Sequence, residues 1–226
     1  MFLISACTIL IIFTFLQGKS NQRKMITPDG EARLVTTKGV LITFALILIV
    51  TSTLRYGFID TYAYKIMYRE SRNNLEYVNS APWGVEAGWL YLLYYLNYIT
   101  SSPKIMLFLV ALVVNMAYIL MAKKYSSDVL FSAFVYFCIG YLDTNNGVRQ
   151  CFATGITMLA FPLLVEKKYI PYSILVAIAS IFHESAIFLL PIAFVANGKP
   201  FNIKVVLVLI AYFIFSLNPS LISGML

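Results

Sequence analysis

Charged residues are scarce in this chain of 226 residues. Only 12% of its residues are charged, whereas 60% are hydrophobic, and the mean hydropathy is +0.80. A soluble domain of this length carries more charge on its surface, so the composition excludes an ordinary soluble enzyme or binding module. It indicates an all-α, polytopic membrane helix bundle that forms a single integral-membrane domain over residues 1–226, with about 20 residues in each span.

The residues and motifs that bind metals and nucleotides are also missing. The chain has one histidine, His183, and contains no H-E-x-x-H, D-x-D, P-loop or G-x-G-x-x-G pattern. Its three cysteines lack C-x-x-C spacing and lie in or beside apolar runs, so they are expected to be packing residues. We therefore expect neither a metal site nor a cofactor.

Basic residues outnumber acidic ones by 17 to 10, which gives a net charge of +7. They lie at the ends of apolar runs, where lysine and arginine anchor a protein at anionic lipid, so membrane lipid is the expected partner and nucleic acid is not. The first run, residues 2–16, lacks a basic n-region and an A-x-A-like cleavage site. It is expected to be a span with the N-terminus outside rather than a cleavable signal.

Eight apolar runs predict the helices. About seven are expected to cross the membrane, whereas 86–99 is expected to be an interfacial or re-entrant helix on the outer side. This segment starts with Glu86, contains Asn97 and is rich in tryptophan and tyrosine, which prefer the membrane–water boundary. Counting lysine and arginine does not decide the topology, because both arrangements place nine of the 17 inside and eight outside. The runs are 2–16, 39–54, 86–99, 104–121, 129–142, 147–165, 170–190 and 203–217.

Polar groups that interrupt or flank these runs mark a candidate site. If 86–99 does not span, the polar groups of 55–60, 86 and 145–150 all lie at the outer face. The run 170–190 is expected to be one membrane helix, in which His183 lies roughly 10 Å from the outer end. Ionisable groups within hydrocarbon are costly and commonly mark functional sites. We therefore expect one outer site that includes His183.

Arg149 is the candidate for binding a phosphate. It follows Asn145 and Asn146 at the expected N-terminus of a helix, where free N–H groups and a partial positive charge favour anions. Arg55 is expected to supply a second cation, and Asp60 to orient it. The alternatives are an Arg149 that snorkels to lipid head groups, an Arg55 that only marks the end of a span, and a simple turn at the two asparagines.

His183 is the candidate base, because imidazole titrates near neutral pH and accepts a proton from a hydroxyl. Glu86 is a second candidate base, or alternatively an acidic residue that favours the start of a helix. A buried His183 that bonds with Ser180 or Ser185 is the other alternative. Glu184 points about 100° away from His183 on a helix and is expected to contact a neighbouring helix. A cation and a base suit metal-free transfer from a diphosphate to a hydroxyl.

Four motifs, in order along the chain, match one known family. They are Arg55-Tyr-Gly-Phe-Ile-Asp60-Thr-Tyr62, Glu86-Ala-Gly88, Asn146-Gly-Val-Arg149-Gln150-x-x-Ala153 and His183-Glu-Ser185-Ala186. Each motif alone is weak, but the four together, each beside an apolar run, are specific. On these motifs the chain resembles the EpsG/Wzy-type exopolysaccharide (capsular polysaccharide) polymerases of bacteria.

The resemblance implies a GT-C-like glycosyltransferase with many spans in the bacterial plasma membrane. Such an enzyme would polymerise oligosaccharide repeat units carried on undecaprenyl diphosphate at the outer face, by metal-independent transfer with inversion. Flippase and chain-length regulator proteins are the further partners that it implies. The implied site residues are, for catalysis, His183, Arg149 and Glu86 and, for substrate binding, Arg55, Asp60, Asn146 and Gln150.

Three other interpretations stay open. A ligase would move the same glycans to another acceptor. A transporter or flippase would use Arg149, His183 and Glu184 as a substrate or proton pathway, although the sequence shows no inverted repeat. A catalytically inactive scaffold is the third, because family members are usually longer and this chain stops at Leu226, as expected of a short or truncated member.

Overall fold

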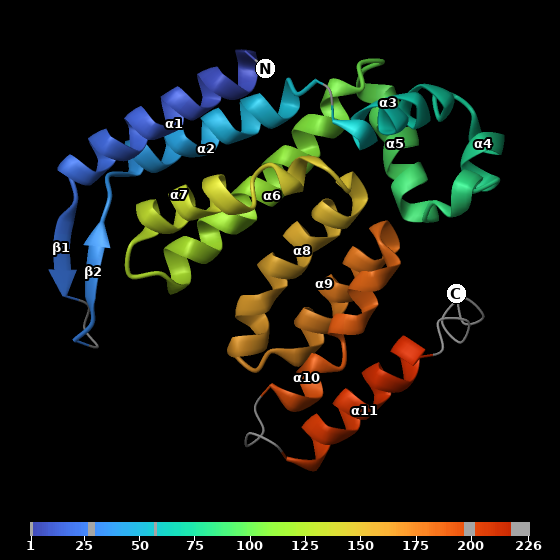
Figure 1. Cartoon of the computed structure of the whole chain (residues 1–226). Coiled ribbons are helices and arrows are strands. Elements are labelled where there is room, and N and C mark those ends of the chain that lie inside the picture. Colours follow the sequence, from blue (N-terminus) through green and yellow to red (C-terminus); the bar gives the residue numbers. More distant parts are fainter. Residues whose placement is uncertain (1, 27–29, 57, 197–201, 218–226) are drawn as a thin grey trace.

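The computed structural model describes residues 2–26, 30–56, 58–196 and 202–217, and it is helical apart from one β-hairpin (Figure 1). The predicted all-α fold is therefore confirmed, with a hairpin that we did not predict. The apolar runs form α1 (Phe2–Ser20), α2 (Lys38–Thr53), α5 (Ala87–Ile99), α6 (Lys104–Tyr125), α7 (Val129–Ile139), α8 (Val148–Val165), α9 (Tyr169–Phe182) and α11 (Ile203–Leu217). The other elements are β1 (Arg23–Ile26), β2 (Ala32–Val35), α3 (Ile59–Glu70), α4 (Leu75–Asn79), α10 (Ile192–Val195) and the 3₁₀ helices η1 (Pro82–Gly84), η2 (Asp143–Asn145) and η3 (Glu184–Leu189).

Two helices in the described part of the chain, α6 and α8, are long and apolar enough to cross a membrane. The other apolar helices there, with α1 counted over its Ser5–Ser20 part, have 10–17 residues, which is fewer than the roughly 20 residues of a typical span. The predicted number of about seven spans therefore stays a prediction.

The long helices pack one after another through the bundle (Figure 1). α1 lies against α2, α2 against α6, α6 against α8, and α8 against α9. α8 approaches α6 closely because Gly155 has no side chain: a Cβ at this position would lie 3.3 Å from the Cα of Val114. Small residues permit such close packing between membrane helices, where dispersion contacts replace the hydrophobic effect.

A buried polar network ties the loop before α8 to the middle of α6. The hydroxyl of Tyr136 donates to Oδ1 of Asn115 at 3.0 Å and lies 3.1 Å from Oγ1 of Thr144. Nδ2 of Asn115 donates to the backbone oxygen of Ala111 at 2.7 Å, so neither end of the amide is left without a partner. This network fixes the start of the loop from which the candidate site is built.

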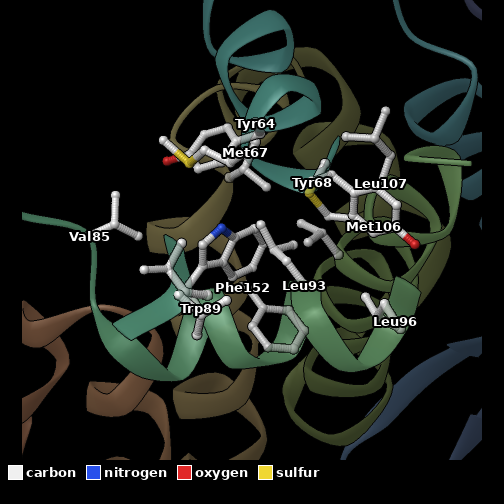
Figure 2. Close-up of a cluster of buried hydrophobic side chains, with 14 of the residues drawn as sticks. Tyr64, Met67, Tyr68, Val85, Trp89, Leu93, Leu96, Met106, Leu107 and Phe152 are labelled. Atoms are coloured by element: carbon white, nitrogen blue, oxygen red, sulfur yellow. The ribbon is translucent and has the colours of Figure 1, made fainter. Parts of the chain in front are cut away.

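α3, α4 and α5 form a cap beside one end of the bundle (Figure 1). The fully buried Trp89 of α5 lies between Tyr64 of α3 and Phe152 of α8, with ring centroids 5.7 Å and 6.1 Å away (Figure 2). With 13 residues, α5 is about 20 Å long, shorter than the roughly 30 Å hydrocarbon core. This length suits the expected interfacial or re-entrant helix, whose place in the membrane stays a prediction.

The end of the bundle opposite the start of α8 is rich in ion pairs. Nζ of Lys124, at the end of α6, lies 2.7 Å from Oε1 of Glu166, at the end of α8, and Lys168 binds the other oxygen at 2.8 Å. Hydrogen bonds from these two lysines lower the pKa of Glu166 to about 2. The lysine pairs 123–124 and 167–168 therefore lie at the same end of the molecule.

The expected continuous helix over 170–190 is wrong. α9 ends at Phe182, His183 has an extended backbone with φ −156° and ψ 113°, and the chain continues in the 3₁₀ helix η3. The backbone N–H of Glu184, freed by this break, donates instead to the side chain of Glu86. His183 thus lies at a helix end rather than within a helix, and the predicted 100° angle to Glu184 does not apply.

Candidate functional site

The carboxylate of Glu86 is the centre of the candidate site. Its Oε2 accepts a hydrogen bond from Nη1 of Arg149 in a close ion pair, and its Oε1 lies 3.0 Å from Nδ1 of His183. The same Oε1 accepts from the N–H of Glu184 at 3.1 Å. The side chains of Glu86, Arg149 and His183 are 14%, 21% and 25% exposed, so a substrate can reach them. The structure therefore brings the three expected catalytic residues together.

Glu86 is placed by the close approach of α5 to α9. It precedes α5, and Gly88 in the first turn of that helix lies against Ile181 of α9. A Cβ at Gly88 would be 2.5 Å from the backbone oxygen of Ile181, which is closer than real Cβ contacts allow. The absence of a side chain at position 88 thus lets the carboxylate reach the end of α9.

Arg149 is placed by the sharp turn that starts α8. Gly147 precedes the helix with φ +57°, a left-handed conformation that favours glycine, and its N–H donates to Oδ2 of Asp60 at 2.7 Å. Arg149 then lies in the first turn, where Nε donates to the hydroxyl of Tyr64 at 3.1 Å. Its guanidinium is held at two points, by Tyr64 of the cap and by Glu86, and this contact explains its position better than snorkelling to lipid.

His183 binds a carboxylate rather than a serine. The hydroxyl of Ser180 donates to the backbone oxygen of Ala177 at 2.7 Å, and Nδ1 of His183 faces Glu86. When Nδ1 carries the proton that the carboxylate accepts, the lone pair of the neutral imidazole is at Nε2. The arrangement therefore orients Nε2 as a proton acceptor.

Asn146 and Gln150 line cavities beside the start of α8. Both are exposed, and both line a cavity of about 440 Å³ beside Tyr118 and Cys151. Gln150 and Thr154 also line a second cavity, of about 210 Å³, whose wall includes His183. Two cavities thus share the same face of α8, and one of them reaches the histidine.

Arg55 and Asp60 are not joined to this cluster by a hydrogen bond in the described residues. Nε of Arg55 donates to Oγ1 of Thr61 at 3.0 Å, and Nη1 donates to Oδ1 of Asn145 at 3.0 Å. The carboxylate of Asp60 accepts a hydrogen bond from the N–H of Gly147. The predicted orientation of Arg55 by Asp60 is therefore replaced by contacts with two neutral side chains. The expected turn at Asn145 is present, but its side chain is buried and bonded to Arg55.

Sequence reasoning missed two residues that shape the site. Tyr64 binds Arg149, and Thr61 binds Arg55. Both are on α3, which was not predicted, because charged and polar residues interrupt its apolar ones and leave no continuous apolar run. The helix is amphipathic, so the period of its apolar residues is the signal that would have found it.

A known protein family matches most of this chain. The profile of the EpsG family matches residues 39–226, a range that contains all four motifs and every side chain of the cluster. No curated protein and no solved structure matches the chain. Since the match covers most of the sequence, the chain belongs to the EpsG family, a family of membrane proteins of polysaccharide biosynthesis.

Proposed function

We propose that this protein polymerises oligosaccharide repeat units carried on undecaprenyl diphosphate, for exopolysaccharide or capsule biosynthesis. The observation that carries the proposal is the single carboxylate that binds both Arg149 and His183. A fixed cation beside an oriented base is what transfer from a diphosphate to a hydroxyl requires. Membership of the EpsG family supports a polysaccharide polymerase.

In the proposed reaction, Arg149 binds the diphosphate of the donor. Its Nε and Nη1 bond with Tyr64 and Glu86, which leaves Nη2 to donate to a phosphate oxygen. The free N–H groups at the start of α8 add a partial positive charge. As the bond from the sugar anomeric carbon to the diphosphate oxygen breaks, these groups stabilise the negative charge that the leaving diphosphate gains.

His183 is the proposed base. Nε2 takes the proton of the acceptor hydroxyl, and that oxygen forms the new bond to the anomeric carbon from the face opposite the diphosphate, which inverts the configuration. Glu86 keeps Nδ1 protonated and stabilises the imidazolium that forms. We assign Glu86 a positioning role, because three donors already occupy its carboxylate.

Asn146 and Gln150 are the proposed contacts for sugars. The cavity beside His183 and the cavity beside Asn146 share Gln150 and Thr154, so two sugar residues can lie on either side of the reacting bond. Asp60 acts through Gly147 by holding the start of α8. The site lies at the outer face in a bacterial plasma-membrane protein of about seven spans, with flippase and chain-length regulator proteins as proposed partners.

Chain growth by purified protein tests the proposal. The protein is placed in liposomes with undecaprenyl-diphosphate repeat units, and products are separated by length. We expect ladders from the wild type and their loss in His183→Gln and Arg149→Met at equal membrane levels. Glu166→Gln at the far end of α8 is the control and is expected to keep its ladders. Unchanged ladders in both site variants contradict the mechanism, and translocation of the glycan without elongation would identify a flippase instead.

A further inference from the structure

A separate cavity of about 250 Å³ lies between α1, α2, α7 and the start of α3. Most of its wall is apolar, and it has room for roughly eight water-sized volumes, which would hold a phosphate group and a few methylene groups. Two of its residues mark the mouth, because Tyr56 is 87% exposed and Leu142 is 48% exposed. Other lining residues are Cys7, Phe58, Phe137 and Cys138.

Arg55 forms the charged part of this wall. The residue is 3% exposed, and its two bonded nitrogens, Nε and Nη1, have the neutral partners Thr61 and Asn145. Nη2 is buried without a hydrogen-bond partner, and no carboxylate forms an ion pair with Arg55 in the part of the chain that the structure describes. The carboxylate of Asp60 attracts Arg55 only from beyond ion-pair distance, so the charge of this buried cation is incompletely balanced. An anion that enters the cavity would supply a closer negative charge.

A second cation lies at the mouth. Nζ of Lys65 is 4.7 Å from the ring centroid of Tyr56. Partial burial, followed by repulsion from Arg55, Arg69 and Lys104, lowers the pKa of Lys65. Several positive charges therefore surround Lys65 at the entrance, and a bound anion would reduce the repulsion between them.

The outer surfaces of the helices that form the cavity are apolar. Leu10 of α1 is 51% exposed and Ile139 of α7 is 74% exposed. Such surfaces suit contact with hydrocarbon, so a ligand that reaches Arg55 along them needs an apolar part as well as an anionic group. A free phosphate ion has no apolar part and does not match the wall.

We propose that this cavity binds an acidic phospholipid, with its phosphate at Arg55 and Lys65 and an acyl chain along α1 and α7. The lipid would stabilise the junction of α2, α3 and α7 that carries Asn145, next to the loop that starts α8. The proposal does not depend on glycosyl transfer, because it concerns a cavity whose lining shares no residue with the two cavities beside α8.

Lipid retention measured by native mass spectrometry tests it. The protein is extracted from nanodiscs of phosphatidylglycerol and phosphatidylcholine, and bound lipid is identified. We expect at least fivefold enrichment of phosphatidylglycerol over phosphatidylcholine. Cys138→Trp, which fills the cavity and leaves the bonds of Arg55 in place, is expected to abolish the enrichment, and Lys65→Ala to reduce it. Ile139→Trp adds the same ring at a neighbouring exposed position outside the cavity and is expected to retain it.

Competition assigns the ligand class. Displacement of phosphatidylglycerol by inorganic phosphate alone would show a simple anion site, and stronger binding of oleate or of undecaprenyl phosphate would show a different amphiphile. Each result would overturn the proposal, as would equal enrichment in Cys138→Trp and the wild type. Thermal unfolding of every variant without added lipid shows whether it is folded. Arg55→Met is only a second variant, because it also removes the bond with Asn145.

Discussion

Nδ1 of His183 lies 3.0 Å from Oε1 of Glu86, although 97 positions separate the two residues in the chain. The other oxygen of the same carboxylate binds Arg149. One side chain thus orients the imidazole and holds the guanidinium, so a change at Glu86 affects both the proposed base and the proposed cation.

Replacing Glu86 with glutamine is expected to lower the rate of chain growth by about 10²–10⁴-fold, the usual contribution of an oriented general base. Arg149 and His183 bind different oxygens of the carboxylate, and glutamine replaces one of these oxygens with a donor NH₂ group, so one of the two residues loses its acceptor. Single-turnover elongation at saturating donor measures the effect. The matched control is Glu166→Gln, and an equal loss in both variants would show that the carboxylate of Glu86 has no special role.

Adding one methyl group at Gly88 is expected to separate α5 from α9. In Gly88→Ala the new Cβ meets the backbone oxygen of Ile181, which cannot move as a flexible side chain does. Overpacking of this kind typically costs about 1–3 kcal/mol. We expect a lower melting temperature and at least a tenfold loss of elongation.

Gly39→Ala is the control for this prediction, because nothing lies within 4 Å of a Cβ at Gly39. It is expected to leave activity unchanged and not to lower the melting temperature, since alanine is the better helix former in α2. Wild-type elongation by Gly88→Ala would mean that the approach of α5 to α9 does not position Glu86.

The left-handed turn at Gly147 predicts a difference between two substitutions. Alanine at φ +57° is expected to cost about 1–2 kcal/mol, whereas asparagine tolerates this conformation better. Chemical unfolding in detergent should therefore rank wild type, Gly147→Asn and Gly147→Ala in that order. Equal stability of the two variants would show that backbone conformation is not what position 147 requires.

The carboxyl of Asp128, at the start of α7, is expected to make the stability of the protein depend on pH. Burial would raise the pKa of its carboxyl, but hydrogen bonds from Lys19, the N–H of Phe131 and Gln22 outweigh burial and lower the pKa. The unfolded carboxyl has a pKa of about 3.9, so the stabilisation is complete above that value and is lost as pH falls through the lower, folded pKa.

Thermal unfolding between pH 3 and pH 7 measures this effect. We expect Asp128→Asn to flatten the acid limb of the wild-type curve. Asp128→Ala is expected to lose in addition about 1 kcal/mol, because Asp128 also caps α7 through Phe131. Glu76→Gln, at an exposed position of α4, is the control. An acid limb that is the same in Asp128→Asn and in wild type would contradict the assignment.

Much of the fold was predictable because apolar runs report helices directly. The helices of 104–121 and 147–165 appear close to their predicted bounds, since each run is long and uninterrupted. α3 and the β-hairpin were missed because neither forms an apolar run. The break at His183 was missed because the residues around it are as apolar as those of a helix. The carboxylate that accepts the freed N–H of Glu184 belongs to Glu86, far away in the chain.

The sequence by itself determined the class of the protein, its helices and the residue types of the site, because composition and apolar runs are local properties. Only the tertiary structure decided which polar groups meet. It joined Arg149 and His183 through Glu86, and it placed Arg55 beside a different cavity, with Thr61 and Asn145 as its partners. The physical reason is that such contacts depend on how closely helices approach, and that distance is set by packing at positions such as Gly88 and Gly155.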